Sequence, residues 1–274
     1  MKSKLNWQQL FCDCKISIQA AIKHCLETMH EPQPDLGRGA GGDLMKPIDV
    51  AAENAIIETL QKSGVSFTLI SEESGIKEVG STPKDCYLCV DPIDGTTNLT
   101  HGLPFYCSSI AISDKPVLAA VYTGAVIDLV HDEIFSAYEG MGSYRDGRVI
   151  HTTNTQSLDE AVIGLDLNVY KAKMNLTIGA AFIENTKHTR HFGANALEVS
   201  YVAAGLTDAF VDLRNKIRTT DIAAGFLIAK EAGAIITDVD NKSINVPLDP
   251  KQTLNFIASA NETLHKQLLG LIKS

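Results

Sequence analysis

The spacing of apolar residues along this chain predicts helices and strands that alternate. From Trp7 to Met29, apolar side chains recur every three to four residues, the spacing of one face of a long helix. The shorter apolar runs at 65–70 and 86–90 are typical of buried strands. Because both patterns continue along the chain, we expect an α/β (α+β) fold rather than an all-helical one.

The same spacing rules predict the remaining elements. Apolar runs predict strands at 107–114, 117–124, 133–138, 207–213 and 256–260, with the run at 161–165 opening a second half of the chain. Helical spacing predicts helices at 49–61, 171–184, 194–204, 221–232 and 261–272. Asp49, Asp221 and Asn261 stand where N-cap residues belong. The polar stretch 151–158 separates an N-terminal α+β half, 1–150, from a C-terminal α/β half, 151–274, and we expect the two halves to form one compact unit.

The segment from Glu31 to Gly42 breaks this pattern with two prolines and four glycines. A glycine-rich stretch can cradle phosphate, but no Gly-Lys-Ser/Thr sequence follows here, so the phosphate-loop motif is absent. We expect a mobile flap that continues to Asp49 and orders when ligands bind, since ordering its glycines is entropically costly.

Composition narrows the class of protein. The chain has 274 residues, 45% of them hydrophobic, and a formal charge of −9, which disfavours nucleic acid and acidic membranes as partners. No window reaches the roughly 18 apolar residues of a spanning helix, and the N-terminus does not have the pattern of a secretory signal. We expect a cytoplasmic protein whose six cysteines are thiols. Strand alternation places Cys86 and Cys89 on opposite faces, which argues against zinc.

The most informative segment runs from Val90 to Leu103 and reads VDPIDGTTNLTHGL. Pro92 keeps Asp91 extended at the end of a strand, and Asp94-Gly95 is a turn dipeptide. Gly95 to Thr97 then resembles the first turn of a short helix, whose free amides attract phosphate. Two carboxylates three residues apart beside an anion site call for cations between them. The segment therefore indicates a hard-metal phosphate site with oxygen ligands, the alternative being an acidic surface turn.

Two other segments add carboxylates to this picture. Glu72 and Glu73 follow the strand predicted at 65–70, and Asp221 opens the helix predicted at 221–232. For Asp221 alone, the ordinary alternative is a helix cap with no further role.

These motifs resemble those of the magnesium-dependent, lithium-sensitive phosphatases that include inositol monophosphatase and fructose-1,6-bisphosphatase. The matching pieces are EES at 72–74, DPIDGTTN at 91–98 and DIAAGFLIAKEAG at 221–233, in the family's order and spacing. The segments RHFGANA at 190–196 and DLRNKIR at 212–218 are most similar to the archaeal type with both activities. The resemblance covers nearly the whole chain and implies a layered α-β-α-β-α sandwich.

The resemblance also implies a metal centre. Two or three Mg²⁺ ions, which Mn²⁺ could replace, would be held by Glu72, Asp91, the Ile93 carbonyl, Asp94 and Asp221, with Asp91 bridging two ions. The charges agree with this, because carboxylates so close together repel unless dications lie between them.

The resemblance assigns the reaction steps as well. Asp49 and Thr96 would form a pair that orients or deprotonates a water, with Glu72 as a competing candidate. Asp94 and the amides of Gly95 and Thr96 would hold the substrate, and phosphate would transfer in line to water without a covalent intermediate. Glu73 is either a support for the ligands or a plain surface acid.

Substrate choice depends on three more residues. Arg190, Asn195 and Arg214 match positions that contact substrate in the archaeal enzymes, and arginine favours the bidentate phosphate contact of a bisphosphate. We therefore expect a fructose-1,6-bisphosphatase with inositol-1-monophosphatase activity, acting as a homodimer on sugar or polyol phosphates. The alternatives are an inositol monophosphatase only, a 3′(2′),5′-bisphosphate nucleotidase, or an inactive regulator that binds sugar phosphate.

Overall fold

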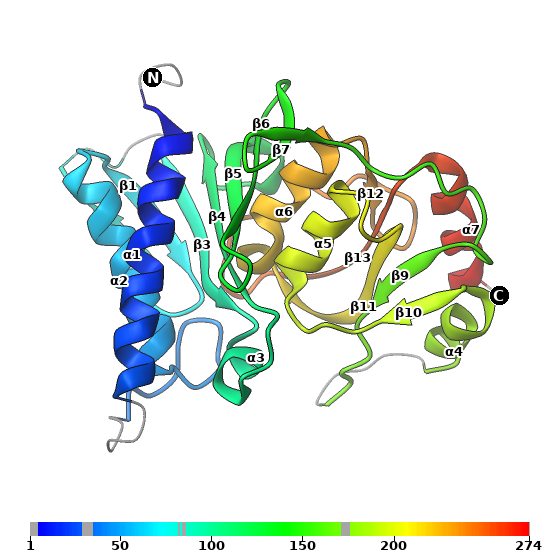
Figure 1. Cartoon of the computed structure of the whole chain (residues 1–274), viewed down its shortest axis with the longest axis horizontal. Helices are drawn as coiled ribbons and strands as arrows, with labels where there is room; N and C mark the ends of the chain where they lie inside the picture. Colours follow the sequence, from blue (N-terminus) through cyan, green and yellow to red (C-terminus); the bar gives the residue numbers. More distant parts are fainter. Residues whose placement is uncertain (1–4, 29–34, 82, 84–85, 171–175, 274) are drawn as a thin grey trace.

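The computed structural model of the chain describes residues 5–28, 35–81, 83, 86–170 and 176–273. In Figure 1, layers follow one another from left to right: helices, a sheet, central helices, a second sheet and outer helices. This order confirms the predicted α-β-α-β-α sandwich.

The first sheet belongs to the N-terminal part of the chain and has eight strands, in the order β2-β1-β3-β4-β5-β6-β7-β8. Its strands are β1 (Phe67–Ser71), β2 (Gly75–Val79), β3 (Tyr87–Asp94), β4 (Cys107–Ser113), β5 (Val121–Asp128), β6 (Glu133–Tyr138), β7 (Gly142–Arg145) and β8 (Arg148–Ile150). Two short helical segments interrupt it, α3 (Thr96–His101) and the 3₁₀ turn η1 (Leu118–Ala120). Helices α1 (Trp7–Glu27) and α2 (Pro47–Lys62) cover its outer face with their apolar stripes, so one hydrophobic core lies between them and the sheet.

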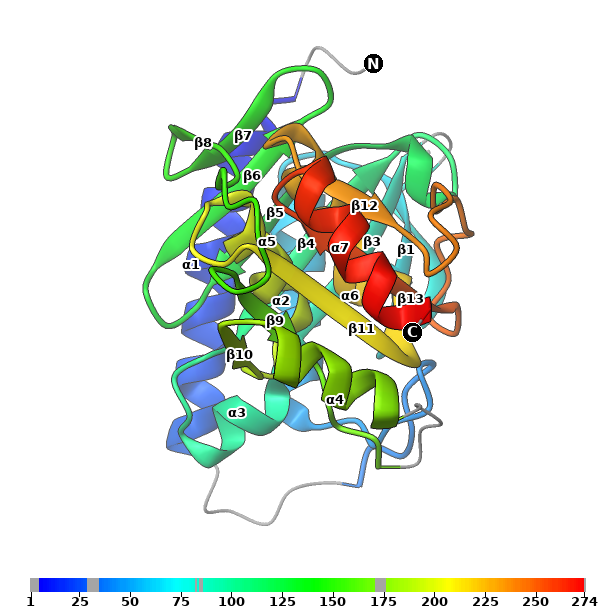
Figure 2. The same ribbon diagram turned by 90° about the vertical axis from the view of Figure 1, so that its right-hand side faces the viewer.

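The second sheet has five strands in the order β10-β9-β11-β13-β12. These are β9 (Val162–Leu165), β10 (His188–Arg190), β11 (Ala209–Arg218), β12 (Ile235–Thr237) and β13 (Thr253–Ser259). Helices α4 (Leu176–Asn185) and α7 (Glu262–Lys273) lie over its outer face, as Figure 2 shows in green and red.

Helices α5 (Asn195–Ala203) and α6 (Thr219–Glu231) form the central layer between the two sheets. Every residue of α6 from Thr219 to Ala229 is buried, because small side chains such as Ala223 and Ala224 let it approach both sheets closely. A helix buried on all sides cannot shift without disturbing the largest core cluster of the protein. Its first turn, which carries Asp221, is therefore held firmly between the sheets.

Several sequence predictions need correction. The strand expected at 117–124 begins only at Val121 and continues to Asp128, because residues 118–120 form a 3₁₀ turn that buries Leu118. Neither Asp49 nor Asp221 is an N-cap: each is the third residue of a helix that begins at Pro47 or at Thr219. Five strands were not predicted, β2, β7, β8, β10 and β12.

Some predictions concern residues that lie partly outside the described ranges. Residues 29–34 of the expected flap lie outside the described residues, as does the start of the helix expected at 171–184. The division of the chain at 151–158 stays a prediction. Within the described ranges, no helix combines the length and apolarity needed to cross a bilayer. The six cysteines are free thiols.

Candidate active site

Two parallel strands bring the first pair of carboxylates together. Strands β1 and β3 run parallel with Ser71 opposite Val90, so Glu72, the residue after β1, and Asp91, the next residue of β3, emerge side by side. Asp91 remains within β3, opposite Ser109 of β4, and Pro92 follows it as expected. Glu72 lies in the tight turn between β1 and β2, which the buried carboxylate of Glu53 holds by accepting hydrogen bonds from the Ser71 hydroxyl and the Ser74 amide.

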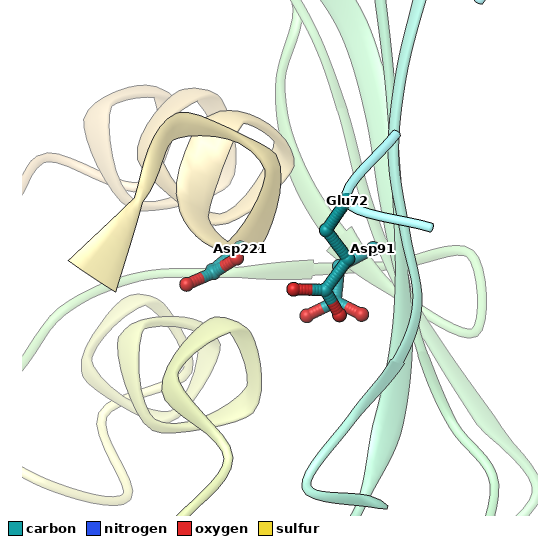
Figure 3. Close-up of side chains that lie close together, drawn as sticks. All are labelled: Glu72, Asp91 and Asp221. Carbon is teal, nitrogen blue, oxygen red and sulfur yellow. The ribbon is translucent and has the colours of Figure 1, made fainter. Parts of the chain in front are cut away.

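Asp221 approaches this pair from the central layer. Carboxylate oxygens of Glu72, Asp91 and Asp221 lie within 4.8 Å of one another. Figure 3 shows the three side chains converging from the first sheet and from the start of α6. Three of the four carboxylates proposed as metal ligands thus meet in one place.

The raised pKa values of this cluster indicate that its carboxyl groups must hold protons or bind a cation. Burial, followed by repulsion from its acidic neighbours, raises the pKa of Asp91 well above its ordinary value, and burial and Asp221 together raise the pKa of Glu72 to about 8. Carboxylates packed this tightly share protons or bind cations. An all-oxygen set of this kind fits a hard dication such as Mg²⁺.

Asp94 stands beside the cluster rather than within it. Its Oδ2 accepts a hydrogen bond of 2.6 Å from the amide of Ala196, in the first turn of α5, and the backbone amide of Asn195 also donates to this carboxylate. Burial, with Asp221 next, raises its pKa to about 7. Asp94 therefore ties the central layer to β3 as well as facing the acidic cluster.

The predicted partners Asp49 and Thr96 are in contact. Thr96 Oγ1 lies 2.9 Å from Asp49 Oδ1 and 2.9 Å from the Ile93 carbonyl oxygen. Burial raises the pKa of Asp49 to about 6, although the Thr96 hydroxyl lowers it. Gly95 precedes α3 with a φ of 91°, a left-handed conformation that favours glycine.

A cavity of about 700 Å³ opens next to these residues. Residues from both halves line it, and they include Asp49, Glu72, Gly95, Thr96, Asn195 and Arg214. Asn195 contributes a buried Oδ1 that has no hydrogen-bond partner among the described residues, an acceptor suited to a substrate hydroxyl.

The two arginines expected to bind substrate differ in position. Arg214 lines the cavity, but its guanidinium is buried and bonded to Asp212 at 2.5 to 3.2 Å and to Asp166 at 2.5 Å. Arg190 is exposed, donates to the Thr189 carbonyl and is not among the described residues that line the cavity.

Sequence reasoning missed several residues of the site. Arg218, the last residue of β11, forms ion pairs with Glu72 and with Asp43. His191 lines the cavity, with Nδ1 3.3 Å from Asp166. Arg218 lies inside the matched segment 212–218 but looks like any basic residue at a strand end, so only the three-dimensional contacts distinguish it.

The chain is similar to known phosphatases over most of its length. The model of the inositol monophosphatase family matches residues 8–274. A fructose-1,6-bisphosphatase/inositol-1-monophosphatase of Thermococcus kodakarensis is 32% identical over 98% of both chains. A bifunctional NADP phosphatase/NAD kinase of Methanococcus maripaludis is 35% identical over 85% of this chain, which spans 43% of that protein. A solved Pyrococcus horikoshii structure, described as similar to inositol-1 monophosphatase, is 30% identical over 98% of both chains, with a TM-score of 0.80.

The site is thus that of a metal-dependent phosphomonoesterase. This chain belongs to the inositol monophosphatase family.

Proposed function

We propose that this protein hydrolyses fructose 1,6-bisphosphate and inositol 1-phosphate in a Mg²⁺-dependent reaction. The observation that carries the proposal is the convergence of Glu72, Asp91 and Asp221 within 4.8 Å, next to the contact between Asp49 and Thr96. The similarity to the Thermococcus enzyme over 98% of both chains supports this pair of substrates.

Each residue then has a defined role. Glu72, Asp91, Asp94, Asp221 and the Ile93 carbonyl would hold the ions, which supply a nucleophilic water of lowered pKa and stabilise the leaving oxygen. Asp49 accepts a proton through the Thr96 hydroxyl, and its pKa of about 6 keeps it ionised at neutral pH. The amides of Gly95 and Thr96 would bind the phosphate oxygens, and Asn195 Oδ1 would accept a hydroxyl of the sugar or polyol.

A second candidate substrate is a nucleotide phosphate. The similarity to the NADP phosphatase of Methanococcus maripaludis favours removal of a phosphate from the ribose of a dinucleotide. The chemistry at the metal carboxylates would be the same, and only the contacts in the outer cavity would differ. We also propose a cytoplasmic homodimer that is inhibited by lithium, as the family resemblance implies.

The test is phosphate release from four substrates side by side: fructose 1,6-bisphosphate, inositol 1-phosphate, adenosine 3′,5′-bisphosphate and NADP. We expect turnover of the first two with Mg²⁺ and none after chelation. Turnover of NADP alone would replace the proposed substrates, and no turnover of any of the four would contradict the function.

Asp91→Asn tests the metal assignment. A neutral amide is a poor bridging ligand, so we expect a loss of activity of at least about a hundredfold and a loss of Mn²⁺ binding in calorimetry. The matched control is Glu58→Gln, an exposed carboxylate on α2 that pairs only with Lys62 among the ion pairs described. Wild-type turnover in Asp91→Asn would remove Asp91 from the site.

A further inference from the structure

Arg218 joins two parts of the active site that are far apart in the sequence. Its Nη1 contacts the carboxylate of Glu72, and its Nη2 contacts the carboxylate of Asp43, in the loop before α2. Its side chain is 17% exposed, and its own backbone amide donates to Asp221 Oδ2 at 2.9 Å. One residue therefore contacts the acidic cluster and the loop at the same time.

The loop of residues 38–44 is fitted closely to this arginine. The amide of Gly41 donates to the Glu72 carbonyl at 2.8 Å, and the amide of Ala40 donates to the Glu73 carbonyl at 3.1 Å. A Cβ atom at Gly41 would lie 3.0 Å from the guanidinium carbon of Arg218, and one at Gly39 would lie 2.7 Å from the Glu72 carbonyl oxygen. Glycine at both positions lets the loop lie directly against Arg218 and the Glu72 turn.

Arg218 also pairs with a carboxylate of the acidic cluster. The carboxyl groups of Glu72, Asp91 and Asp221 are crowded together, and the guanidinium of Arg218 is the cation that contacts Glu72 within the described residues. Arginine suits this position because its planar fork can reach two carboxylates at once. Arg218 Nη1 contacts Oε2 of Glu72, so it engages the same carboxylate group that a metal ion would require.

We propose that Arg218 is a latch that a metal ion displaces. Without the ion, Arg218 pairs with Glu72 and holds the loop 38–44 against the site through Asp43. A metal ion at Glu72 competes for the same carboxylate and repels the guanidinium, so metal binding releases Arg218 from Glu72. This inference deepens the proposed function and rests on the assignment of Glu72 as a metal ligand.

The sign of the effect distinguishes this role from a purely structural one. If Arg218 competes with the metal, its removal frees Glu72 and removes a repelling charge, so metal binds more tightly. If Arg218 instead holds Glu72 in the geometry that the metal needs, its removal weakens binding.

The experiment compares three variants by two measurements. Mn²⁺ binding is measured by calorimetry, and amide hydrogen exchange of residues 38–44 is measured in chelator-treated protein. Arg218→Gln should bind Mn²⁺ at least about threefold more tightly and should lose at least about threefold of the loop's protection. Asp43→Asn should lose loop protection alone, since it breaks the ion pair with the loop and leaves Glu72 paired.

Arg38→Gln is the matched control. Arg38 lines the same cavity and carries the same charge, but its Nη1 donates to the Gly42 carbonyl within the loop at 2.8 Å. If Arg38→Gln increased the affinity for Mn²⁺ as much as Arg218→Gln does, the effect would come from removing any positive charge near the site, and the proposal would be overturned. Weaker Mn²⁺ binding in Arg218→Gln, or unchanged loop exchange, would also overturn it. No Mn²⁺ binding by the wild type would refute both the proposed function and the displacement, whereas normal wild-type binding with unchanged variants refutes the latch alone.

Discussion

At the scale of single residues, Arg214 shows why a basic side chain in a cavity does not by itself indicate a phosphate site. The sequence suggested a bidentate contact with a second phosphate. In the structure its Nε and Nη2 are bonded to Asp212 and Asp166, both buried. Asp166 also accepts from the Asn168 amide at 2.9 Å and lies 3.3 Å from His191 Nδ1. Arg214 therefore supports the lining of the cavity first, and what remains of its guanidinium is available to substrate.

This position predicts two effects of Arg214→Ala. Two buried carboxylates would lose their cation, so we expect the free energy of unfolding, measured in urea, to fall by about 3–5 kcal/mol. Use of fructose bisphosphate should fall at least about tenfold more than use of inositol phosphate, because a charge-assisted hydrogen bond contributes about 1.5–3 kcal/mol. Equal losses on both substrates would leave Arg214 a structural role only.

Arg190→Ala and Arg148→Ala complete the comparison. Both arginines are exposed, so either substitution should change the free energy of unfolding by no more than about 0.5 kcal/mol. A selective loss with fructose bisphosphate in Arg190→Ala would support its expected contact with phosphate, and Arg148, on β8, should show none.

At the scale of elements, the sequence predicted most of the long helices and the central strands, because their apolar periods are clear. It missed β2, β7, β8, β10 and β12, which have at most five residues each. Residues of β2 such as Lys77 and Glu78 are exposed and polar, and β2 forms through its pairing with β1 and not through an apolar pattern. Tertiary pairing, which no local pattern reveals, decides such strands.

In the site too, some residues could be predicted from the sequence, whereas others are defined only by tertiary contacts. The motifs singled out the carboxylates of Glu72, Asp91 and Asp221, which the structure brings together, and the family resemblance paired Asp49 with Thr96, which are in contact. Arg218 and His191 lie inside the matched segments 212–218 and 190–196, but nothing in those segments distinguishes them from other basic residues, and Asp166 lies in no matched segment. Their roles arise only where β11, β9 and the loop before α5 meet the cavity.

The turn into α3 makes an element-scale prediction. Gly95 has a φ of 91°, and a Cβ there would lie 3.0 Å from the Phe105 carbonyl oxygen and 3.1 Å from the Ala194 Cβ. Gly95→Ala should therefore lower the free energy of unfolding by about 1–3 kcal/mol, through left-handed strain and crowding. It should also lower activity, because α3 begins with Thr96, the partner of Asp49.

A matched substitution separates strain from crowding. Gly102, at the other end of α3, has a φ of 73°, but a Cβ added there would meet no atom of the described residues within 4 Å. Gly102→Ala should cost only the backbone strain and leave activity unchanged. Equal activity losses in both variants would show that α3 as a whole, and not its first turn, controls the site.

At the scale of the whole molecule, folding brings together and buries carboxyl groups that the unfolded chain keeps apart in water. Burial raises the pKa of Asp49 to about 6, and burial followed by Asp221 raises those of Asp94 to about 7 and Glu72 to about 8. Their ordinary values are 3.8 for Asp and 4.5 for Glu, so the folded protein binds more protons than the unfolded chain across this range. Stability of the metal-free protein must therefore fall as pH rises from about 4 to about 8.

Mg²⁺ should reverse this loss. A dication favours ionised carboxylates, so the increase in melting temperature on adding Mg²⁺ should be larger at pH 8 than at pH 5. At a concentration of 100 times Kd, the ion contributes about 2.7 kcal/mol, or roughly 5–10 °C for a chain of this size. An increase of the same size at both pH values would show that the ion binds elsewhere than at these carboxylates.

Glu198 is a buried carboxylate outside the proposed metal site, so it serves as a control for the effect of Mg²⁺ on Glu72. It is buried in α5, where burial raises its pKa to about 8, and its Oε2 has no hydrogen-bond partner in the part of the chain that the structure describes. It is not part of the cluster of Glu72, Asp91 and Asp221. Because its folded pKa is raised, Glu198→Gln should gain stability relative to the wild type between pH 6 and pH 9, with or without Mg²⁺.

Glu72→Gln should show such a gain only without the ion, since bound Mg²⁺ stabilises the ionised wild-type carboxylate. Melting curves of both variants at pH 6 and pH 9 decide the matter, and a gain in Glu72→Gln that persists with saturating Mg²⁺ would exclude Glu72 as a ligand.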